Sequence, residues 1–549
     1  MAGQFGSGAA WMRVAAMLAA MLAAAMLVGC GGGGGGGDAI SSAPGGTAGS
    51  GGSLPGGTAS PDPAGPSASF AQQCAATNTL AASGLRTASL TTEKQWLRAY
   101  FDEAYLWRDE VPPVDPSLPS YSGADSYAAM AAYFQALKTP QLTGSGNRRD
   151  RFSFTYSTAQ WRALADTGVE AGYGAEWTLA SKLPPRRIRI AYVEPGSPAE
   201  TAGLQRGDEL LFVDDTSADA ADAAGVDRLN AGLYPKSTGA VHRFVFRRSG
   251  TSDLTLSLTS ASVTKTPVPL ARVVTSPQGT RAGYLVFHDH SAPSEAPLIA
   301  ALQGFQAQGV RELVLDLRYN GGGYLYIASE LASMIAGNIR TAGRAFETLR
   351  YSPRRSGENT TTPFYTQSCI ASGGSCTNTQ PLPSLALTRV YLLAQPGTCS
   401  ASESVINGLR GVGVNVVLIG GSTCGKPYGF TAKDNCGITY FPIEFSGVNA
   451  QGFGDYADGF EPTSGADTGS RLVTGCRVED DFGRALGDPQ EAMLASALGH
   501  LDSGRCPVLP GPAAGARAQS APTTVNGEAS VPLELQRHPA RSNRLMRAR

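Results

Sequence analysis

The stretch RVYLLAQPGTCSASESVINGLRGVGVNVVLI, residues 389–419, decides the fold. Its hydrophobic pattern predicts a buried strand, a helix and a second buried strand, at residues 389–395, 402–411 and 414–419. In such a βαβ unit the strands are parallel, so the start of the helix and the end of the second strand meet at one edge of the sheet. Ser400 and Lys426 are therefore expected to converge.

A third segment is expected at the same edge. Residues 312–317 (ELVLDL) predict another short buried strand, followed by the glycine-rich RYNGGG at 318–323 and an amphipathic helix over 324–336. Ligands of open α/β sheets bind at the carboxyl ends of strands, where the backbone can approach them closely. We expect the glycines to face Ser400 and Lys426.

This arrangement predicts acyl-transfer chemistry. A serine hydroxyl needs a base to become a nucleophile, and a lysine amine is such a base only when burial lowers its pKa from about 10.4. A helix start also stabilises developing negative charge. The amide of Ala401, with that of Gly322 or Gly323, is a candidate oxyanion hole.

Each of these residues also has an ordinary explanation. Ser400 and Glu403 fit a capping box, and a lone lysine after a strand usually lies in a solvated turn. His288 and His290, in FHDHS, are candidate cleft residues, but a polar pair at a strand end is the simpler interpretation. The combination of serine, lysine and glycine loop in one sheet favours the catalytic interpretation.

The segments DLRYNGGG (316–323), SASE (400–403) and Gly425-Lys426 resemble the signature blocks of the carboxy-terminal processing peptidases, or tail-specific proteases. The resemblance covers residues 91–501. It implies a serine endopeptidase with a Ser/Lys dyad and an acyl-enzyme, acting on proteins with free, unstructured C-terminal tails. Residue by residue, it implies Ser400 as nucleophile, Lys426 as general base, and Ala401 with Gly322 as oxyanion donors.

Two positions depart from the family pattern. The acidic partner that some members have in the helix after the serine falls near Arg410 and Gly411 in this chain. Several members place a glutamine four residues after the lysine to orient it, and this chain has Phe430 there. Glu403, one helical turn from Ser400, is a possible orienting residue. The alternative function is a catalytically impaired, PDZ-containing lipoprotein scaffold that binds peptides.

Residues 191–214 resemble the core of a PDZ domain, with a short helix capped by Ser197. Upstream, Gly172, Tyr173 and Gly174 match the loop whose amides hold a peptide's terminal carboxylate while the peptide adds a strand. A plain turn between two strands is the alternative for this Gly-Tyr-Gly sequence.

The N-terminus predicts export. An apolar run over 14–28 ends in Leu27-Val28-Gly29-Cys30, which resembles a bacterial lipobox cleaved before Cys30. Cys30 would then carry acyl chains and tether the protein to the membrane of the bacterial cell envelope, with the outer membrane facing the periplasm as the expected site. An uncleaved membrane anchor is the alternative.

The expected fold class is multidomain α/β and α+β: a small N-terminal helical domain, a PDZ-like β-rich domain and an α/β protease domain with a mostly parallel sheet. The predicted divisions are a signal peptide, a flexible linker that includes Cys30, the helical domain, the PDZ domain, the peptidase domain and a disordered tail, at residues 1–29, 30–69, 70–169, 170–262, 263–506 and 507–549. Thr92 is the expected cap of the first long helix, and Asp488 that of a closing helix to Leu501.

Composition narrows the function further. A formal net charge of −1 and the lack of a basic stripe argue against nucleic acid as a partner. Cys74, Cys436, Cys476 and Cys506 lack any CxxC pairing, so we do not expect a structural zinc site. The expected Ser/Lys chemistry needs no metal and no organic cofactor. Two disulfides are candidates, Cys369 with Cys376 across a Gly-rich turn and Cys399 with Cys424 beside the proposed catalytic residues. A cysteine protease using Cys399 lacks a suitably placed histidine.

Overall fold

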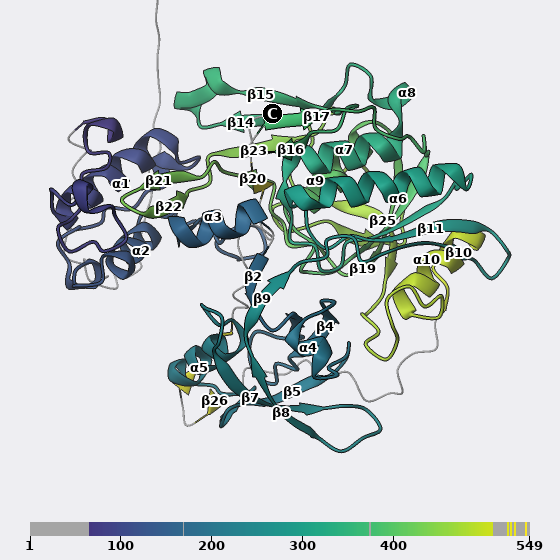
Figure 1. Cartoon of the computed structure of the whole chain (residues 1–549). Helices are drawn as coiled ribbons and strands as arrows, with labels where there is room; N and C mark the ends of the chain where they lie inside the picture. The colour runs from purple at the N-terminus through teal and green to yellow at the C-terminus, as the bar shows by residue number, and fades with distance from the viewer. Residues whose placement is uncertain are drawn as a thin grey trace, which may run out of the picture. The chain divides into compact units, whose positions relative to one another are not determined.

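The computed structural model describes residues 65–167, 169–372 and 375–508, and the pairs 524–525, 528–529, 532–533 and 544–545. Figure 1 shows three kinds of architecture along the chain: a helical part, a β-rich part and an α/β part. The expected signal peptide, Cys30 and most of the linker over 30–69 lie outside the described residues.

The helical part is built on three helices, α1 (Leu90–Ala104), α2 (Ser126–Ala136) and α3 (Thr158–Thr167). Helix α1 begins earlier than predicted: Ser89 is its N-cap and accepts the Thr92 N–H at 3.3 Å. Thr92 lies inside the first turn, because the extended Ser89 already supplies the capping oxygen. The aromatic side chains of α1, among them Trp96, Tyr100 and Phe101, are buried in the core.

The core of the helical part is completed by residues 430–443, which belong to the α/β part in sequence. Phe430 and Tyr440 are buried in one cluster with Trp96 of α1. Strand β1 (Phe154–Ser157) pairs with β22 (Ile438–Phe441), which pairs with β21 (Lys433–Asn435). The Cys74–Cys436 disulfide links the start of the helical part to the turn between β21 and β22. Part of the core of the helical part, predicted over 70–169, is therefore supplied by residues from later in the chain.

The β-rich part contains a six-stranded sheet of order β3-β4-β5-β7-β8, with β6 on β5. The strands are β3 (Ala175–Thr178), β4 (Arg189–Val193), β5 (Glu209–Val213), β6 (Thr216–Ser217), β7 (Val241–Arg247) and β8 (Leu254–Thr259). Helices α4 (Pro198–Thr201), capped by Ser197, and α5 (Ala223–Leu233) accompany the sheet. Strand β3 is an edge strand, which leaves one side of it available for a further strand. Strands β2 (Val169–Gly172) and β9 (Ala261–Thr264) pair with each other where the chain enters and leaves the β-rich part.

The α/β part is organised around a seven-stranded sheet of order β10-β11-β12-β18-β19-β25-β24. Only the β10–β11 pair is antiparallel, so the sheet is mostly parallel, as predicted. The strands are β10 (Leu270–Thr275), β11 (Arg281–Val286), β12 (Leu313–Asp316), β18 (Arg389–Ala394), β19 (Asn415–Gly420), β24 (Glu461–Thr463) and β25 (Leu472–Arg477).

Helices cover both faces of this sheet (Figure 1). Along β12, Leu313 and Leu315 pack with α6 (Glu295–Ala307), α7 (Leu325–Ala336) and α9 (Ala401–Gly411), whereas Val314 packs with α10 (Ala492–Ser503). Because successive side chains point to opposite faces, both faces must be apolar, which explains the continuous apolar runs in the sequence. Helix α10 starts later than predicted: Glu491 caps it, while the Asp488 carboxylate accepts the Gln490 N–H in the preceding turn.

The predicted βαβ unit is β18, α9 and β19, with Arg389 to Ala394 in parallel register with Asn415 to Gly420. The element bounds differ from the prediction by one residue. Strand β12 lies beside β18, so the three segments predicted to meet do leave adjacent parallel strands.

A second sheet of order β15-β14-β23-β20 lies in the same part. Its strands are β14 (Ala345–Tyr351), β15 (Thr360–Pro363), β20 (Tyr428–Gly429) and β23 (Phe445–Val448). A hairpin of β16 (Ile370–Ser372) and β17 (Ser375–Asn378) carries the Cys369–Cys376 disulfide, and the short helix α8 (Asn338–Thr341) follows α7.

The C-terminal region, expected to be disordered over 507–549, contains three short strands among its described residues. They are β26 (Thr524–Val525), β27 (Glu528–Ala529) and β28 (Arg544–Leu545). Strand β28 pairs with the edge of β13 (Gly323–Tyr324). The composition of the C-terminal region does not predict this pairing, because it depends on an edge strand elsewhere in the chain.

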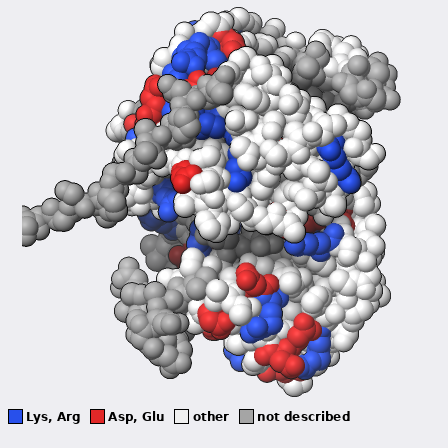
Figure 2. Space-filling model, turned by 90° about the vertical axis from the view of Figure 1, so that its left-hand side faces the viewer, with Lys and Arg blue, Asp and Glu red and all other residues white. Residues whose placement is uncertain are grey.

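Charges are distributed over the surface without a dominant sign. On the face shown in Figure 2, basic and acidic side chains are interspersed in small groups. None of the helices in the described part of the chain has the length and apolar character that crossing a bilayer requires.

Candidate active site

Three segments leave the carboxyl ends of adjacent parallel strands. Residues 317–323 follow β12, Ser400 follows β18 and Lys426 follows β19. Their backbones are in contact, since the Cys399 N–H donates to Asn320 O at 3.1 Å and the Cys424 N–H donates to Thr398 O at 3.0 Å. The sheet thus brings together the three motifs that the sequence singled out.

Ser400 lies at the N-cap of α9 and is fully buried. Its backbone has φ 60° and ψ −111°, a conformation that L-residues other than glycine rarely adopt. Strain of this kind persists only where surrounding contacts enforce it. The strained turn places the residue where the first amides of α9, beginning with Ala401, lack partners within the helix.

Lys426 is also fully buried, and its side-chain nitrogen lies among aromatic rings. Nζ is 5.0 Å from the ring centroid of Phe152 and 4.7 Å from that of Phe430. Phe430, which occupies the position of the family's orienting glutamine, therefore forms an apolar wall of the lysine site.

Arg151, from the helical part, fixes the backbone of the turn that carries Lys426. Its guanidinium donates to Cys424 O at 2.8 Å and to Ala457 O at 3.0 Å. Phe152 is the next residue, so one short segment both anchors the lysine turn and covers the lysine.

Glu403 joins the two turns. Its Oε2 accepts the N–H of Ser400 at 2.9 Å and that of Lys426 at 2.8 Å. Its Oε1 accepts the Gly425 N–H at 2.8 Å and the Thr423 hydroxyl at 2.5 Å. Burial raises the pKa of Glu403, although these donors act in the opposite direction. Glu403 therefore orients the backbones of both residues.

A disulfide reinforces this junction. Cys399 and Cys424, which precede Ser400 and Lys426 by one and two residues, are bonded to each other. The remaining described disulfide, Cys476–Cys506, was not predicted because sequence spacing cannot pair distant cysteines. In the described residues, two groups of side chains have the spacing of metal ligands. One is Cys74, Glu93 and Cys436, and the other is Cys399, Glu403 and Cys424. In each group the two cysteines are bonded to each other as a disulfide.

The glycine loop faces this junction. The Gly322 N–H, an expected oxyanion donor, donates to the Asn320 side-chain oxygen at 3.0 Å. Gly323 has φ +136°, and a Cβ there would lie 2.5 Å from His290 O, so only glycine fits. In this conformation Gly322 would have to release Asn320 to serve an oxyanion.

His290 holds the glycine loop through both its side chain and its backbone. Its Nδ1 is 3.1 Å from Asn320 Oδ1, so it carries the proton and donates it. Its backbone N–H donates to Gly322 O at 2.9 Å, and its carbonyl accepts the Tyr324 N–H at 2.8 Å. Burial lowers the pKa of His290 to about 4, which keeps the ring neutral near pH 7. His290 is thus a positioning residue, whereas His288 stacks on Tyr192 of the β-rich part.

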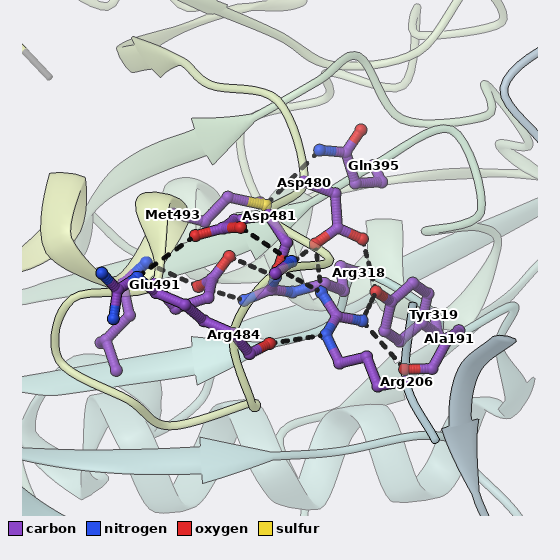
Figure 3. A network of polar contacts seen from close by, with 12 residues as sticks. Ala191, Arg206, Arg318, Tyr319, Gln395, Asp480, Asp481, Arg484, Glu491 and Met493 are labelled. Carbon is purple, nitrogen blue, oxygen red and sulfur yellow. Dashed lines mark hydrogen bonds and ion pairs between the residues drawn. The ribbon is translucent and has the colours of Figure 1, made fainter. Parts of the chain in front are cut away.

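A buried ionic network holds the start of the same loop (Figure 3). Arg318 pairs with Asp316, with Glu491 of the α10 cap at 2.9 Å and with Asp480 at 2.8 Å. Burial alone would raise the pKa of Asp480, but the neighbouring guanidinium groups outweigh it and lower the pKa.

Arg206 links the β-rich part to this network by hydrogen bonds and an ion pair. Arg206 bonds Asp480 at 2.6 Å, Ala191 O at 2.9 Å and the Tyr319 hydroxyl, which itself donates to Asp480 (Figure 3). Sequence reasoning missed Arg206, Asp480, Arg151, Phe152 and Asn320. The DLRYN segment could have pointed to Asn320, but the others act from distant segments and had no local signal.

The predicted carboxylate-binding loop lies just before the edge strand β3. Gly174 has φ +80°, and a Cβ there would lie 2.2 Å from the Ser197 Cβ. The Tyr173 carbonyl accepts the Ala199 N–H at 2.8 Å, and its side chain is buried. The loop is therefore closely packed on the start of α4.

Comparisons with known proteins match all three parts. Residues 281–433 match the model of peptidase family S41, residues 92–154 that of the peptidase S41 N-terminal domain, and residues 189–229 that of a PDZ domain. Ser400, Lys426, Ala401, Gly322 and Glu403 all fall within the first match.

Two curated relatives are cyanobacterial. The chain is 29% identical over 278 residues to a carboxyl-terminal-processing protease of Picosynechococcus, covering 49% of this chain and 57% of the relative. It is 28% identical over 267 residues to the corresponding Synechocystis protease, covering 48% and 54%. The chain thus matches little more than half the length of these relatives.

A solved structure agrees over a larger share. The crystal structure of an S41 protease homologue from Bacteroides fragilis aligns with a TM-score of 0.54 at 25% identity, covering 74% of this chain and 97% of that chain.

Proposed function

Because this chain belongs to peptidase family S41 and carries a PDZ domain, we propose that it is a serine endopeptidase that hydrolyses peptide bonds in proteins with unstructured C-terminal tails. Ser400 is the nucleophile and Lys426 the general base. The observation that carries the proposal is the shared Glu403 carboxylate oxygen, which binds the backbone N–H of both residues.

The proposed chemistry uses the buried Lys426 amine as the base and the buried Ser400 hydroxyl as the nucleophile. Burial disfavours the charged form of an amine, and the Phe152 and Phe430 rings supply the apolar surroundings of Lys426 Nζ. Neutral Nζ accepts the Ser400 proton as Oγ attacks the carbonyl carbon. It then returns the proton to the leaving amine, which departs from an acyl-enzyme. Water, deprotonated by the same amine, attacks the ester and releases the acid and Ser400.

The developing oxyanion needs two donors. The amide of Ala401, at the start of α9, is one. The second comes from the glycine loop, through Gly322 after it leaves Asn320, or through Gly323. Removing one such donor from a serine protease typically costs a factor of about 10² to 10³ in kcat.

The test is covalent labelling combined with turnover. A serine-directed phosphonate should attach to Ser400, and both labelling and hydrolysis of a disordered-tail substrate should be lost in Ser400→Ala and Lys426→Ala. Lys433→Ala, which removes an exposed lysine from β21, is the matched control and should behave as the parent chain. Proteolysis retained by Ser400→Ala would refute the assignment.

The PDZ domain is proposed to capture the substrate's tail. The edge position of β3 supports addition of a peptide strand there, next to the Gly172, Tyr173 and Gly174 loop. A peptide ending in a free carboxylate should bind Ser400→Ala protein more tightly than the same peptide with an amidated end.

We extend the proposal to location. The lipobox-like sequence supports acylation of Cys30 and tethering to the envelope membrane, with the enzyme facing the periplasm. Cys30→Ser should move the protein from the membrane fraction to the soluble fraction. Unchanged fractionation would contradict the lipid anchor.

The alternative is a peptide-binding scaffold without turnover, which Phe430 at the orienting position favours. Binding of tail peptides without cleavage or phosphonate labelling would support it.

A further inference from the structure

Two described pieces of the C-terminal region lie in other parts of the molecule. The first is Leu533, which is fully buried in the PDZ core together with Trp177 of β3 and Leu229 of α5. Its backbone N–H donates to Lys182 O, in the connection after β3, at 2.9 Å. A residue so near the end of the chain thus occupies the same core as the elements that border the free edge of β3.

The second piece is β28, which lies on the glycine loop. Arg544 is in parallel register with Gly323, and Leu545 with Tyr324. The other side of Gly323 is taken by a bridge to His290. Strand β28 therefore fills the remaining edge of β13, immediately after the proposed oxyanion donor Gly322.

One continuous segment can satisfy both contacts. Ten residues separate Leu533 from Arg544, and a chain of that length spans up to about 40 Å when extended. The Cys476–Cys506 disulfide attaches the start of the C-terminal region to β25. Such tethering gives the tail an effective concentration on the order of 1 mM at sites it can reach.

The order of the two contacts is the reverse of a substrate's. A protein held by its C-terminus in the PDZ domain offers Ser400 a bond on the N-terminal side of the held residues. Here the residues beside the glycine loop are C-terminal to the one held in the PDZ core. Leu533 and β28 therefore contact the two sites in the order opposite to that of a substrate that is about to be cleaved.

We propose that the C-terminal segment carrying Leu533 and β28 is a resident ligand of this chain's own peptide-binding path, with Leu533 in the PDZ core and β28 on the β13 edge, and that it excludes substrates without being cleaved; this rests on the proposed protease function. Recognition is by β-strand addition at β13 and by burial of an apolar side chain in the PDZ domain. The occupant is the same chain, because the tether favours the intramolecular contact.

The first test compares tail variants in turnover of a disordered-tail substrate. A chain ending at Val508, which keeps Cys506, should show kcat/KM about tenfold higher than the full chain, if the free tail binds with a Kd of about 0.1 mM. Full-length protein with residues 524–549 in scrambled order should show the same gain and guards against misfolding by truncation. Scrambling residues 509–523 alone should change nothing. Equal kcat/KM in all forms would overturn the proposal.

The second test measures binding and hydrogen exchange and does not require catalytic turnover. A synthetic peptide of residues 532–549 should bind the Ser400→Ala chain ending at Val508, and Leu533→Asp in the peptide should weaken binding at least tenfold. In full-length Ser400→Ala protein, hydrogen exchange at the Leu533 amide should accelerate when a tail-substrate peptide is added. No peptide binding, or unchanged exchange, would overturn the proposal.

The two proposals fail in distinguishable ways. Peptide binding without hydrolysis by any form would leave the resident ligand standing and refute the protease. Hydrolysis at equal rates without peptide binding would do the opposite. Intact mass spectrometry of the active full chain should show an uncut tail, and a cut between residues 540 and 549 would overturn the claim that the tail is not a substrate.

Discussion

The turns that carry Ser400 and Lys426 are held differently from the glycine loop opposite them. The two turns are joined by Glu403 and by the Cys399–Cys424 disulfide, all within residues 399–426. The glycine loop is held by His290, by the α10 cap and by Arg206 of the PDZ domain.

This difference separates two requirements of the proposed reaction. The nucleophile and base are assembled by local contacts within the peptidase domain. The donors that would stabilise the transition state lie on a loop whose position depends on distant segments, including the PDZ domain and the C-terminal β28. A change in the PDZ domain is therefore expected to affect the glycine loop first.

The largest effect is expected from Glu403→Gln. The carboxamide keeps the shape but can accept on one oxygen only, so two of the four donors lose their acceptor, at a cost of about 1 to 3 kcal/mol each. We expect kcat to fall by about 10³, equivalent to about 4 kcal/mol. Steady-state kinetics measures this.

The matched control is Glu312→Gln, whose carboxylate pairs with Arg389 near the surface. It should change kcat by less than about twofold. If Glu403→Gln behaved like this control, the junction would not be what holds the two turns.

The second prediction concerns the disulfide beside the proposed catalytic residues. Cys399→Ser with Cys424→Ser should lower the free energy of unfolding by about 3 kcal/mol, the entropy expected for a loop of this length. Activity should fall with it, because both turns lose a covalent restraint. Urea denaturation and kinetics report the two effects.

Removing Cys369 and Cys376 in the same way is the comparison, because their bond closes a seven-residue separation away from the site. It should leave kcat unchanged. An equal loss of activity in both double variants would contradict a special role for the first disulfide.

The third prediction is a pH dependence that originates at the glycine loop. His290 titrates at about 4 in the folded chain and near 6.5 when unfolded, so only the unfolded state takes up a proton between these values. This contribution to stability is complete above pH 6.5 and is lost as the pH falls to 4, by about 3 kcal/mol.

His290→Gln should remove that part of the pH dependence, as measured by denaturation at pH 7 and pH 4. His242→Gln, at an exposed PDZ strand, should retain it. An identical loss of stability on acidification in the His290 variant and the parent would show that other groups are responsible.

The smallest effect is expected at the domain contact. Arg206→Ala removes the PDZ ligand of Asp480 and of the Tyr319 hydroxyl, while Arg318 still pairs with Asp480. We expect kcat to fall about fivefold, or about 1 kcal/mol, with KM for a short substrate unchanged. Arg243→Ala, at an exposed ion pair of the same domain, is the control. A change in KM alone would place the effect in peptide capture instead.

Much of the site could be predicted because its signals are local. The alternating and continuous apolar runs of β18 and β19 define the strands, and the handedness of the crossover fixes which ends meet. Glu403 was noticed through its spacing from Ser400, though the sequence suggested that it orients the lysine. The structure assigns it to the backbones of both turns, which only the fold of residues 423–426 determines.

Phe430 shows where local reasoning fails. From the sequence, Phe430 is notable only because it stands where a glutamine is expected to orient the lysine. In the structure its ring lies beside Lys426 Nζ, together with the ring of Phe152 from the helical part. The same holds for the tail, whose composition predicts disorder but whose β28 pairs with β13.

The sequence by itself determined the βαβ unit, the parallel sheet and the convergence of the turns that carry Ser400 and Lys426, because strand periodicity and crossover handedness depend on neighbouring residues. Only the tertiary structure decided which rings surround the amine, that Arg206 reaches Tyr319, and which segment lies on β13. These contacts join residues far apart along the chain, and their stability comes from burial and pairing that exist only once the parts have packed.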